Sequence, residues 1–295
     1  MRIGNLLWSA VAAIILALPP FLFLSAPGSG VQSGPVRTIN AYLKSAYAHD
    51  QKKAYRLISQ RDRLIKSEDI YIQEKGPFSG FTLVVAEKLA EMIEIGETSE
   101  SANGATTKVK LSVKYPDANS LSTLLLDWDQ DKLNALPPQS QKEIITTIEN
   151  LHDAGKLKFI EGEEELSLVK ENGRWRILFD WAAGLRVQYD AIVPSSKVIE
   201  ATPMNRETSV RANELFTVVY RVRNLSNQAI ATRIIHRVEP EELRHYVDLV
   251  ECALLLPVKL RPSEEREFSS TYMARGDLPD GSKHVKVTYD FQVEN

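Results

Sequence analysis

The chain of 295 residues contains a single cysteine, Cys252, and this count constrains the fold more than any other feature of the sequence. One cysteine cannot form an intramolecular disulfide, and it cannot assemble a zinc site of the Cys₄ or Cys₂His₂ type. Both kinds of scaffold are therefore excluded. Three roles stay open for Cys252: an inert buried thiol, a metal ligand, or a partner in an intermolecular bond.

The N-terminal segment carries an uncharged run from Leu6 to Leu24, which is long enough to cross a hydrocarbon core as a helix. The run exceeds a typical signal-peptide core of about 7–15 residues. Residues 1–27 therefore predict a retained single-pass transmembrane helix in preference to a cleaved signal peptide. The tandem Pro19-Pro20 argues against a regular span. Residues 28–35, rich in glycine, serine and proline, predict a flexible tether.

Arg2 precedes this run, which places the rest of the chain outside the cytoplasm by the positive-inside rule. The expected location is therefore the inner membrane of a cell, with the soluble domains on the periplasmic or extracytoplasmic side. The membrane would be one partner of the chain, through the N-terminal helix.

The composition narrows the function classes. Apolar residues make up 43% and charged residues 25% of the chain, which excludes wholesale disorder and a polytopic membrane protein. A formal net charge of −3 gives no basic excess for nucleic acid, so no nucleic-acid partner is expected. The chain lacks a phosphate-binding Gly-Lys motif, a nucleophile elbow, a zincin helix and a dinucleotide fingerprint, and we expect it not to be an enzyme.

The first soluble domain is expected at residues 36–184, with mixed α and β structure. The apolar spacing predicts helices over 36–49 and 53–59, and another over 140–151 with Ser140 as its N-cap. Residues 81–95 suit a helix or a strand. Asn103-Gly104 and Asn172-Gly173 each predict the turn of a β-hairpin.

Two short helices leading into an antiparallel sheet, closed by the hairpin around Asn172-Gly173 and Trp175, resemble the cone-shaped fold of nuclear transport factor and ketosteroid isomerase. That fold encloses a pocket that serves as an active site in some families and as a docking surface in others. Asp127, Asp129 and Asp180 are conceivable pocket acids, but an enzyme or lipid-binding role would rest on fold analogy alone.

The second soluble domain is expected at residues 190–295. Short alternating segments separated by polar turns predict strands over 215–223, 230–238, 248–256, 267–273 and 284–293. Strands of this length and spacing, over about a hundred residues, are typical of an immunoglobulin-like β-sandwich.

A series of residues in this second domain has a recognisable order and spacing: Asn224, Ile230, Val238-Glu239-Pro240, Tyr246, Cys252, Leu260, Pro262 and Glu264-Glu265. In this series the domain resembles the CtaG-type cytochrome c oxidase assembly proteins. The match runs without a gap from Asn224 to about Glu265, and residues 287–291 resemble the final strand of the family. The resemblance implies an immunoglobulin-like domain that carries copper, behind one transmembrane helix and a short tether.

The sequence departs from the family at its copper strand. The family has a Cys-Phe-Cys-Phe strand, whereas this chain keeps Cys252 and has Leu254 in the second place. Residues i and i+2 of a strand share a face, so the family strand presents two thiolates and this chain presents one. Cu(I) prefers soft thiolate and thioether ligands. The resemblance therefore implies a degenerate Cu(I) site at Cys252.

Three additions would complete such a site. Two copies of Cys252 would meet across the axis of a homodimer. Met273, His236 or His245 would act as an accessory ligand if the fold brings one of them close. An oxidase subunit or another envelope protein would supply a ligand as the client.

Two hypotheses follow. In the first, the chain is a membrane-anchored, extracytoplasmic assembly factor that passes Cu(I) to a heme-copper oxidase without catalysis. In the second, the copper site has been lost and the chain is a protein-interaction module of the cell envelope.

Overall fold

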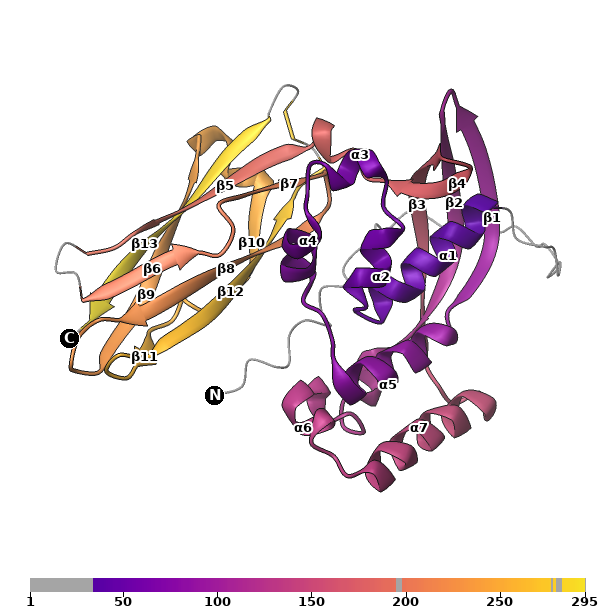
Figure 1. Ribbon diagram of the computed structural model, residues 1–295, viewed down its shortest axis with the longest axis horizontal. Coiled ribbons are helices and arrows are strands. Elements are labelled where there is room, and N and C mark those ends of the chain that lie inside the picture. The colour runs from indigo at the N-terminus through magenta and orange to yellow at the C-terminus, as the bar shows by residue number, and fades with distance from the viewer. Residues whose placement is uncertain (1–33, 195–197, 277, 280–282, 295) are drawn as a thin grey trace. The chain divides into compact units, whose positions relative to one another are not determined.

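The computed structural model describes residues 34–194, 198–276, 278–279 and 283–294 (Figure 1). Contacts divide these residues into two units. The α+β unit comprises residues 34–61 and 76–179, and the sandwich unit comprises residues 62–75 and 180–294. The segment 62–75 lies in sequence within the expected first domain but belongs to the sandwich unit. The sequence pattern did not predict this assignment.

The helices of the α+β unit follow from apolar spacing and local capping. They are α1 (Gly34–Tyr47), α2 (Gln51–Arg56), α5 (Gly80–Glu91), α6 (Gln130–Asn134) and α7 (Pro138–Asp153), with α3 (Gln60–Arg63) at the boundary of the units. Helix α1 buries Val36, Ile39, Leu43 and Tyr47 along one face, as the spacing predicts. The ambiguous segment after residue 80 is helical.

The start of α7 corrects one expectation. The helix begins at Pro138 with Pro137 as its N-cap, so Ser140 lies inside the first turn and does not cap it. Proline suits the first turn because its missing N–H would have no partner there.

The sheet of the α+β unit is an antiparallel meander of β1 (Glu94–Asn103), β2 (Thr106–Pro116), β3 (Phe159–Glu171) and β4 (Arg174–Leu178). Asn172 and Gly173 both have positive φ, at 48° and 78°, as a two-residue type I′ turn requires. Helix α1 packs against β2 and β4, and α5 packs against α1 and α7. The hairpin at Asn172-Gly173 is therefore as the sequence predicts. The β1–β2 hairpin also forms, but its turn lies one residue later than predicted, because Asn103 pairs with Thr106 and leaves Gly104 and Ala105 as the loop.

The sandwich unit contains nine of the described strands in two sheets (Figure 1). One sheet has the order β10-β12-β8-β6, and the other has the order β11-β9-β13-β5-β7. Their bounds are β5 (Leu185–Ile192), β6 (Ile199–Pro203), β7 (Glu207–Val210), β8 (Leu215–Asn224), β9 (Ile230–Glu239), β10 (Val247–Cys252), β11 (Val258–Leu260), β12 (Glu265–Ala274) and β13 (His284–Glu294). Strands β5 and β13 pair in parallel, and the other pairs are antiparallel. Sequence reasoning did not identify β5, β6 and β7.

Stacked aromatic rings join the two sheets. Tyr220 of β8 stacks on Tyr289 of β13 at 4.3 Å between ring centroids, which links the two sheets. Phe216 of β8 stacks on Tyr272 of β12 within one sheet. All four side chains are at most 1% exposed. Aromatic residues bury large areas, so these rings supply much of the core.

Helix α4 (Glu68–Lys75) packs on β8 and completes the sandwich unit. Its docking relies on polar contacts in the interior. Asp62 accepts a hydrogen bond from the backbone N–H of Trp181, and the Trp181 indole N–H donates to Glu214 at 3.0 Å. The buried Lys66 ammonium lies 4.4 Å from the centre of the Trp181 ring and pairs with Glu74.

The expected fold class needs correction at the N-terminus. The transmembrane helix predicted at 1–27, and the tether up to residue 33, lie outside the described residues. Within residues 34–294 as described, no helix is long and apolar enough to cross a membrane. The longest of them, α7, has 16 residues and buries only Ile144 and Ile148. Over the residues that it describes, the structure shows an α+β unit and a β-sandwich, and none of their helices could span a membrane.

Candidate functional site

Cys252 is the last residue of β10, the edge strand of its sheet. The register of β10 on β12 shifts between Leu249 and Glu251, so Leu249 pairs with Tyr272 and Cys252 pairs with Ser270. This β-bulge reverses the alternation that simple counting predicts. As a result Cys252 faces the interior of the sandwich and is still partly exposed at its rim.

Two tyrosine hydroxyls connect the thiol to the core. The Tyr289 hydroxyl lies 3.9 Å from Cys252 Sγ and donates to it. The Tyr272 hydroxyl donates to the Tyr289 hydroxyl at 2.8 Å. Because Tyr272 comes from β12 and Tyr289 from β13, the hydrogen-bond chain crosses from one sheet to the other before it reaches the sulfur.

A third hydroxyl lies at the same place. Ser270 is 2% exposed and stands directly opposite Cys252 in the register of β10 and β12. Its Oγ is near enough to Tyr289 to affect the pKa of that phenol, yet it makes no hydrogen bond of good geometry within the described part of the chain. We call Cys252, Ser270, Tyr272 and Tyr289 the thiol–tyrosine cluster.

Burial keeps the phenols of this cluster protonated. Desolvation raises the pKa of Tyr289 far above its ordinary value, and the neighbouring Tyr272 and Cys252 raise it further. Desolvation raises the pKa of Tyr272 in the same direction. Both groups therefore act as neutral hydrogen-bond donors at any physiological pH.

The structure corrects the expectation that Leu254 lies on the same strand face as Cys252. Strand β10 ends at Cys252, so Leu254 does not share a strand face with it. Leu254 lies in the following turn, is fully buried, and accepts a hydrogen bond from the Ile234 N–H through its carbonyl. Beside it, Leu255 and Leu256 are 48% and 75% exposed, and Val250 at the bulge is 55% exposed.

The three accessory ligand candidates lie in different places. His236 on β9 is half-buried, and its ring meets the Tyr272 ring edge-on at 6.1 Å. Its Nδ1 is buried without a hydrogen-bond partner among the residues described, and burial followed by the charge of Arg244 lowers the pKa of the imidazole. Met273 pairs with Asp248 on the outer face of its sheet, opposite to the side of Cys252. His245 is exposed on the short helix Glu241–Tyr246.

Of these candidates, only His236 is linked to the thiol–tyrosine cluster. No group of three or more His, Cys, Asp or Glu residues with metal-binding geometry occurs in the described ranges. The soft ligand set that the structure shows is therefore one thiol, surrounded by hydroxyls.

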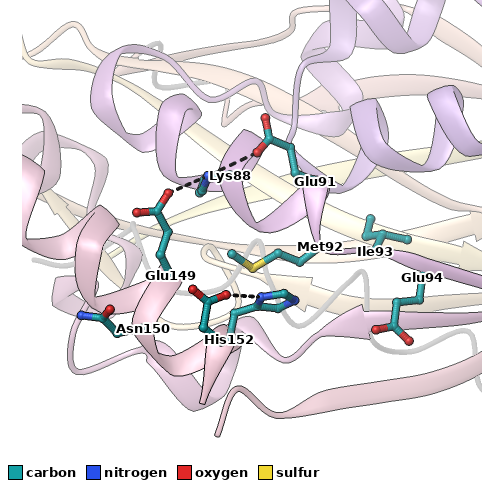
Figure 2. Close-up of a pocket in the computed structure, with 9 residues that line it drawn as sticks. Lys88, Glu91, Met92, Ile93, Glu94, Glu149, Asn150 and His152 are labelled. Carbon is teal, nitrogen blue, oxygen red and sulfur yellow. Dashed lines mark hydrogen bonds and ion pairs between the residues drawn. The ribbon is translucent and has the colours of Figure 1, made fainter. Parts of the chain in front are cut away.

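A separate cleft of about 490 Å³ lies between the ends of α5 and α7 in the α+β unit (Figure 2). Lys88 lies between Glu149, at 2.7 Å, and Glu91, at 3.5 Å. His152 Nδ1 lies 3.2 Å from the Asp153 carboxylate. Met92 lines the cleft together with acidic side chains that are exposed, so the cleft lacks a polar group set deep among apolar walls.

Of the three aspartates considered as pocket acids, Asp129 has a clear structural role. Asp129 accepts a hydrogen bond from the Lys132 N–H at the start of α6, and this contact lowers the pKa of its carboxyl. Asp127 is exposed, and both Asp127 and Asp180 adopt left-handed backbone conformations. None of the three lines the cleft between α5 and α7.

The comparison with protein families concerns the sandwich and the strands that precede it in the sequence. The sequence profile of the family described as "Cytochrome c oxidase assembly protein CtaG/Cox11" matches residues 161–292, just under half of the chain. This range begins in β3 and includes Cys252 and both tyrosines of the thiol–tyrosine cluster. Because the profile covers residues 180–292 of the sandwich, we call this unit the CtaG/Cox11-type domain after the family that it is similar to. The resemblance predicted from the residues around Cys252 is thereby confirmed, whereas the resemblance of the α+β unit to the cone-shaped fold stays a prediction.

Curated relatives agree with this CtaG/Cox11-type domain. The chain is 26% identical over 112 residues to the "Cytochrome c oxidase assembly protein CtaG" of Sinorhizobium medicae, covering 36% of this chain and 57% of the relative. It is 27% identical over 112 residues to the protein of the same name from Brucella anthropi, covering 36% and 55%. The chain thus spans about half the length of the curated relatives that it matches.

Solved structures show only distant similarity to this chain. An Escherichia coli alpha-2-macroglobulin activated by porcine elastase has 9% identity and a TM-score of 0.21, covering 67% of this chain and 22% of that one. A Salmonella alpha-2-macroglobulin reacted with methylamine has 9% identity and a TM-score of 0.23, covering 68% and 16%. At these scores the likeness carries no argument.

Sequence reasoning missed the hydroxyls of the cluster. In the sequence, Tyr289 is recognisable only as one residue of an alternating strand. Tyr272 is the residue before Met273, and of the two only Met273 was considered as a ligand. Alternation places both tyrosines in the core, but the contact between their hydroxyls depends on how two sheets face each other. The β-bulge at Val250 is equally invisible in the sequence.

Proposed function

We propose that the chain is a non-catalytic assembly factor for cytochrome c oxidase and that it works through its CtaG/Cox11-type domain. The match of the family profile over residues 161–292 carries this proposal. The names of the relatives from Sinorhizobium and Brucella support it. The partner is then an oxidase subunit, or another protein of the cell envelope.

Copper handling is the finer part of the proposal. Cu(I) is the cargo, held by the Cys252 thiolate and passed on by ligand exchange without a change in oxidation state. Two features support it: thiolate is a preferred Cu(I) ligand, and Cys252 stands at the partly exposed end of an edge strand where a second protein can reach it. His236, a second copy of Cys252 in a homodimer, or a ligand from the client completes the coordination.

The extracytoplasmic location is also part of the proposal. Its support comes from the charge pattern of the sequence, in which Arg2 precedes an uncharged segment. Periplasmic fractionation of cells that express the chain would test it, and recovery in the cytoplasm would contradict it.

Competition with a colourimetric Cu(I) chelator under anaerobic conditions tests copper binding. The wild-type chain is expected to withdraw Cu(I) from the chelator, and Cys252→Ser is expected to lose this ability. Met273→Leu is the matched control, because Met273 lies on the outer face of its sheet and should not change the affinity. Equal affinity of wild type and Cys252→Ser would contradict the copper role, and the molecular mass measured with and without Cu(I) would show whether a homodimer forms.

A metal-free interaction module is the second candidate. The observation that favours it is the complete burial of Leu254, which fills the position of the second family cysteine, beside the exposed Leu255 and Leu256. Under this alternative, Cys252→Ser supports oxidase assembly in cells as well as wild type does. The double change Leu255→Asp with Leu256→Asp would then abolish assembly while leaving the thermal stability unchanged.

A further inference from the structure

The sulfur of Cys252 accepts a hydrogen bond from the Tyr289 hydroxyl, which in turn accepts one from the Tyr272 hydroxyl of the other sheet. We propose that Tyr289, supported by Tyr272, is a positioning residue for Cys252: its hydroxyl donates the hydrogen bond that orients the sulfur and weakens the Cu(I)–sulfur bond. The Ser270 hydroxyl, which makes no hydrogen bond of good geometry among the described residues, would become a second donor once the sulfur is charged. The biological meaning of this inference rests on the proposed copper role, but the hydrogen bond itself exists in the metal-free chain.

The two hydrogen bonds run in one direction, from Tyr272 through Tyr289 to Cys252. A phenol has one proton to donate. Tyr272 donates its proton to Tyr289, so Tyr289 accepts at its oxygen and directs its own proton to Cys252 Sγ, 3.9 Å away. A donor that also accepts a hydrogen bond is polarised and becomes a stronger donor.

Ser270 gives an independent reason to regard the thiol–tyrosine cluster as a binding site. Its side chain is 2% exposed, stands opposite Cys252, and has no hydrogen-bond partner at good geometry within the ranges described. A buried hydroxyl without a partner is costly and rare in folded proteins. A sulfur that carries negative charge is a better acceptor than a neutral thiol, so binding of a soft cation at Cys252 would satisfy this hydroxyl.

The chemistry of the exchange shows why hydroxyl donors are useful. Cu(I) leaves its donor ligand and bonds to sulfur, the thiol proton passes to solvent, and copper keeps its oxidation state. Hydrogen bonds to a metal-bound thiolate withdraw electron density from the sulfur and tune the metal–ligand bond. With one thiolate and neutral hydroxyls, the domain would hold Cu(I) loosely enough to release it to a client.

The infrared S–H stretching band tests the inference in the metal-free full chain, because Cys252 supplies the only thiol. Tyr289→Phe removes the donor and is expected to shift this band. Tyr220→Phe is the matched control, since the Tyr220 ring stacks on Tyr289 but its hydroxyl donates to the Asp190 carbonyl. Bands that coincide for wild type and Tyr289→Phe would overturn the proposal.

A second variant keeps the test decisive if Tyr289→Phe unfolds. Tyr272→Phe leaves the Tyr289 hydroxyl in place and removes only the proton that it accepts, so the band is expected to shift in the same direction by a smaller amount. A band unchanged in Tyr272→Phe and in Ser270→Ala would count against the proposal.

Measurement of Cu(I) affinity in the same variants separates this inference from the proposed function. Loss of one hydrogen bond to a charged sulfur is expected to raise Cu(I) affinity about tenfold and to slow transfer to a chelator in Tyr289→Phe. If the wild-type chain binds no Cu(I) but the infrared band shifts, the proposed function fails and the positioning role stands. If Cys252 binds Cu(I) and neither band nor affinity responds to Tyr289→Phe, the positioning role fails.

Discussion

Lys66 Nζ lies 2.7 Å from Glu74 Oε2, and both side chains are only 1% exposed inside the sandwich unit. Lys66 precedes helix α4 and Glu74 lies in its last turn, and the helix lies in sequence between α2 and α5 of the other unit. Glu214, at the start of β8, faces the same ammonium at 3.8 Å, and Lys75 reaches Glu214 at 3.5 Å. Segment 62–75 is therefore tied to the sandwich by charges that water does not screen.

Removal of one partner of this pair should destabilise the protein strongly. Glu74→Gln leaves the Lys66 ammonium buried with an incomplete set of acceptors, and breaking a buried pair in this way typically costs about 3–5 kcal/mol. Urea unfolding measures the loss. Glu87→Gln is the control, because the Lys53–Glu87 pair is exposed and should contribute no more than about 1 kcal/mol. Similar losses in the two variants would contradict the buried arrangement.

Acid should weaken the same cluster through Glu214. Burial alone would raise the pKa of this carboxyl, but the charges of Lys66 and Lys75 and the N–H of Arg211 outweigh it and lower the pKa to about 2. A group with a depressed pKa in the folded state contributes stability that is complete above its ordinary value of 4.5 and is lost as the pH falls towards 2. The contribution is of the order of 3 kcal/mol.

Thermal unfolding between pH 2 and pH 6 measures this dependence. The midpoint of wild type should fall steeply below pH 4.5, and Glu214→Gln should be less stable at pH 6 with a shallower slope. A slope that is the same in both proteins would show that other carboxyls control acid unfolding.

A fragment of residues 180–295 should fail to fold by itself. It lacks segment 62–75, so Trp181 would lose Asp62 at its backbone N–H and Lys66 over its ring. Trp181 is the only tryptophan of this fragment, so its fluorescence reports directly on the site. We expect a red-shifted emission that moves to the blue when a peptide of residues 62–75 is added. Native-like emission from the fragment alone would contradict the role of the segment.

The sequence predicted those parts of the structure that depend on local patterns. Alternation predicted β8, β9, β12 and β13, and the turn chemistry of Asn172-Gly173 predicted its hairpin. Segment 62–75 could not be assigned to the sandwich, because its contacts are with Trp181 and Glu214, more than a hundred residues away in the chain.

The candidate site was predicted in the same partial way. The family resemblance identified Cys252 and the fold around it, but the surroundings of the sulfur depend on tertiary structure. One inserted residue at Val250 decides which way Cys252 faces, and the meeting of two sheets decides which hydroxyls it meets. A bulge and a contact between sheets have no periodic signature that alternation could reveal.

Restoring the second family cysteine should not place a second thiol at the surface. Leu254 is fully buried in the turn after β10, so Leu254→Cys introduces a thiol without solvent access. Loss of the larger apolar side chain from the core should cost about 2 kcal/mol, which urea unfolding measures. Brief treatment with iodoacetamide, followed by mass spectrometry, should give one adduct, on Cys252. Leu255→Cys is the control and should give two, because Leu255 is 48% exposed. Two adducts of equal rate in Leu254→Cys would show that the turn opens and that residues 252 and 254 face solvent together, as they would on a regular strand.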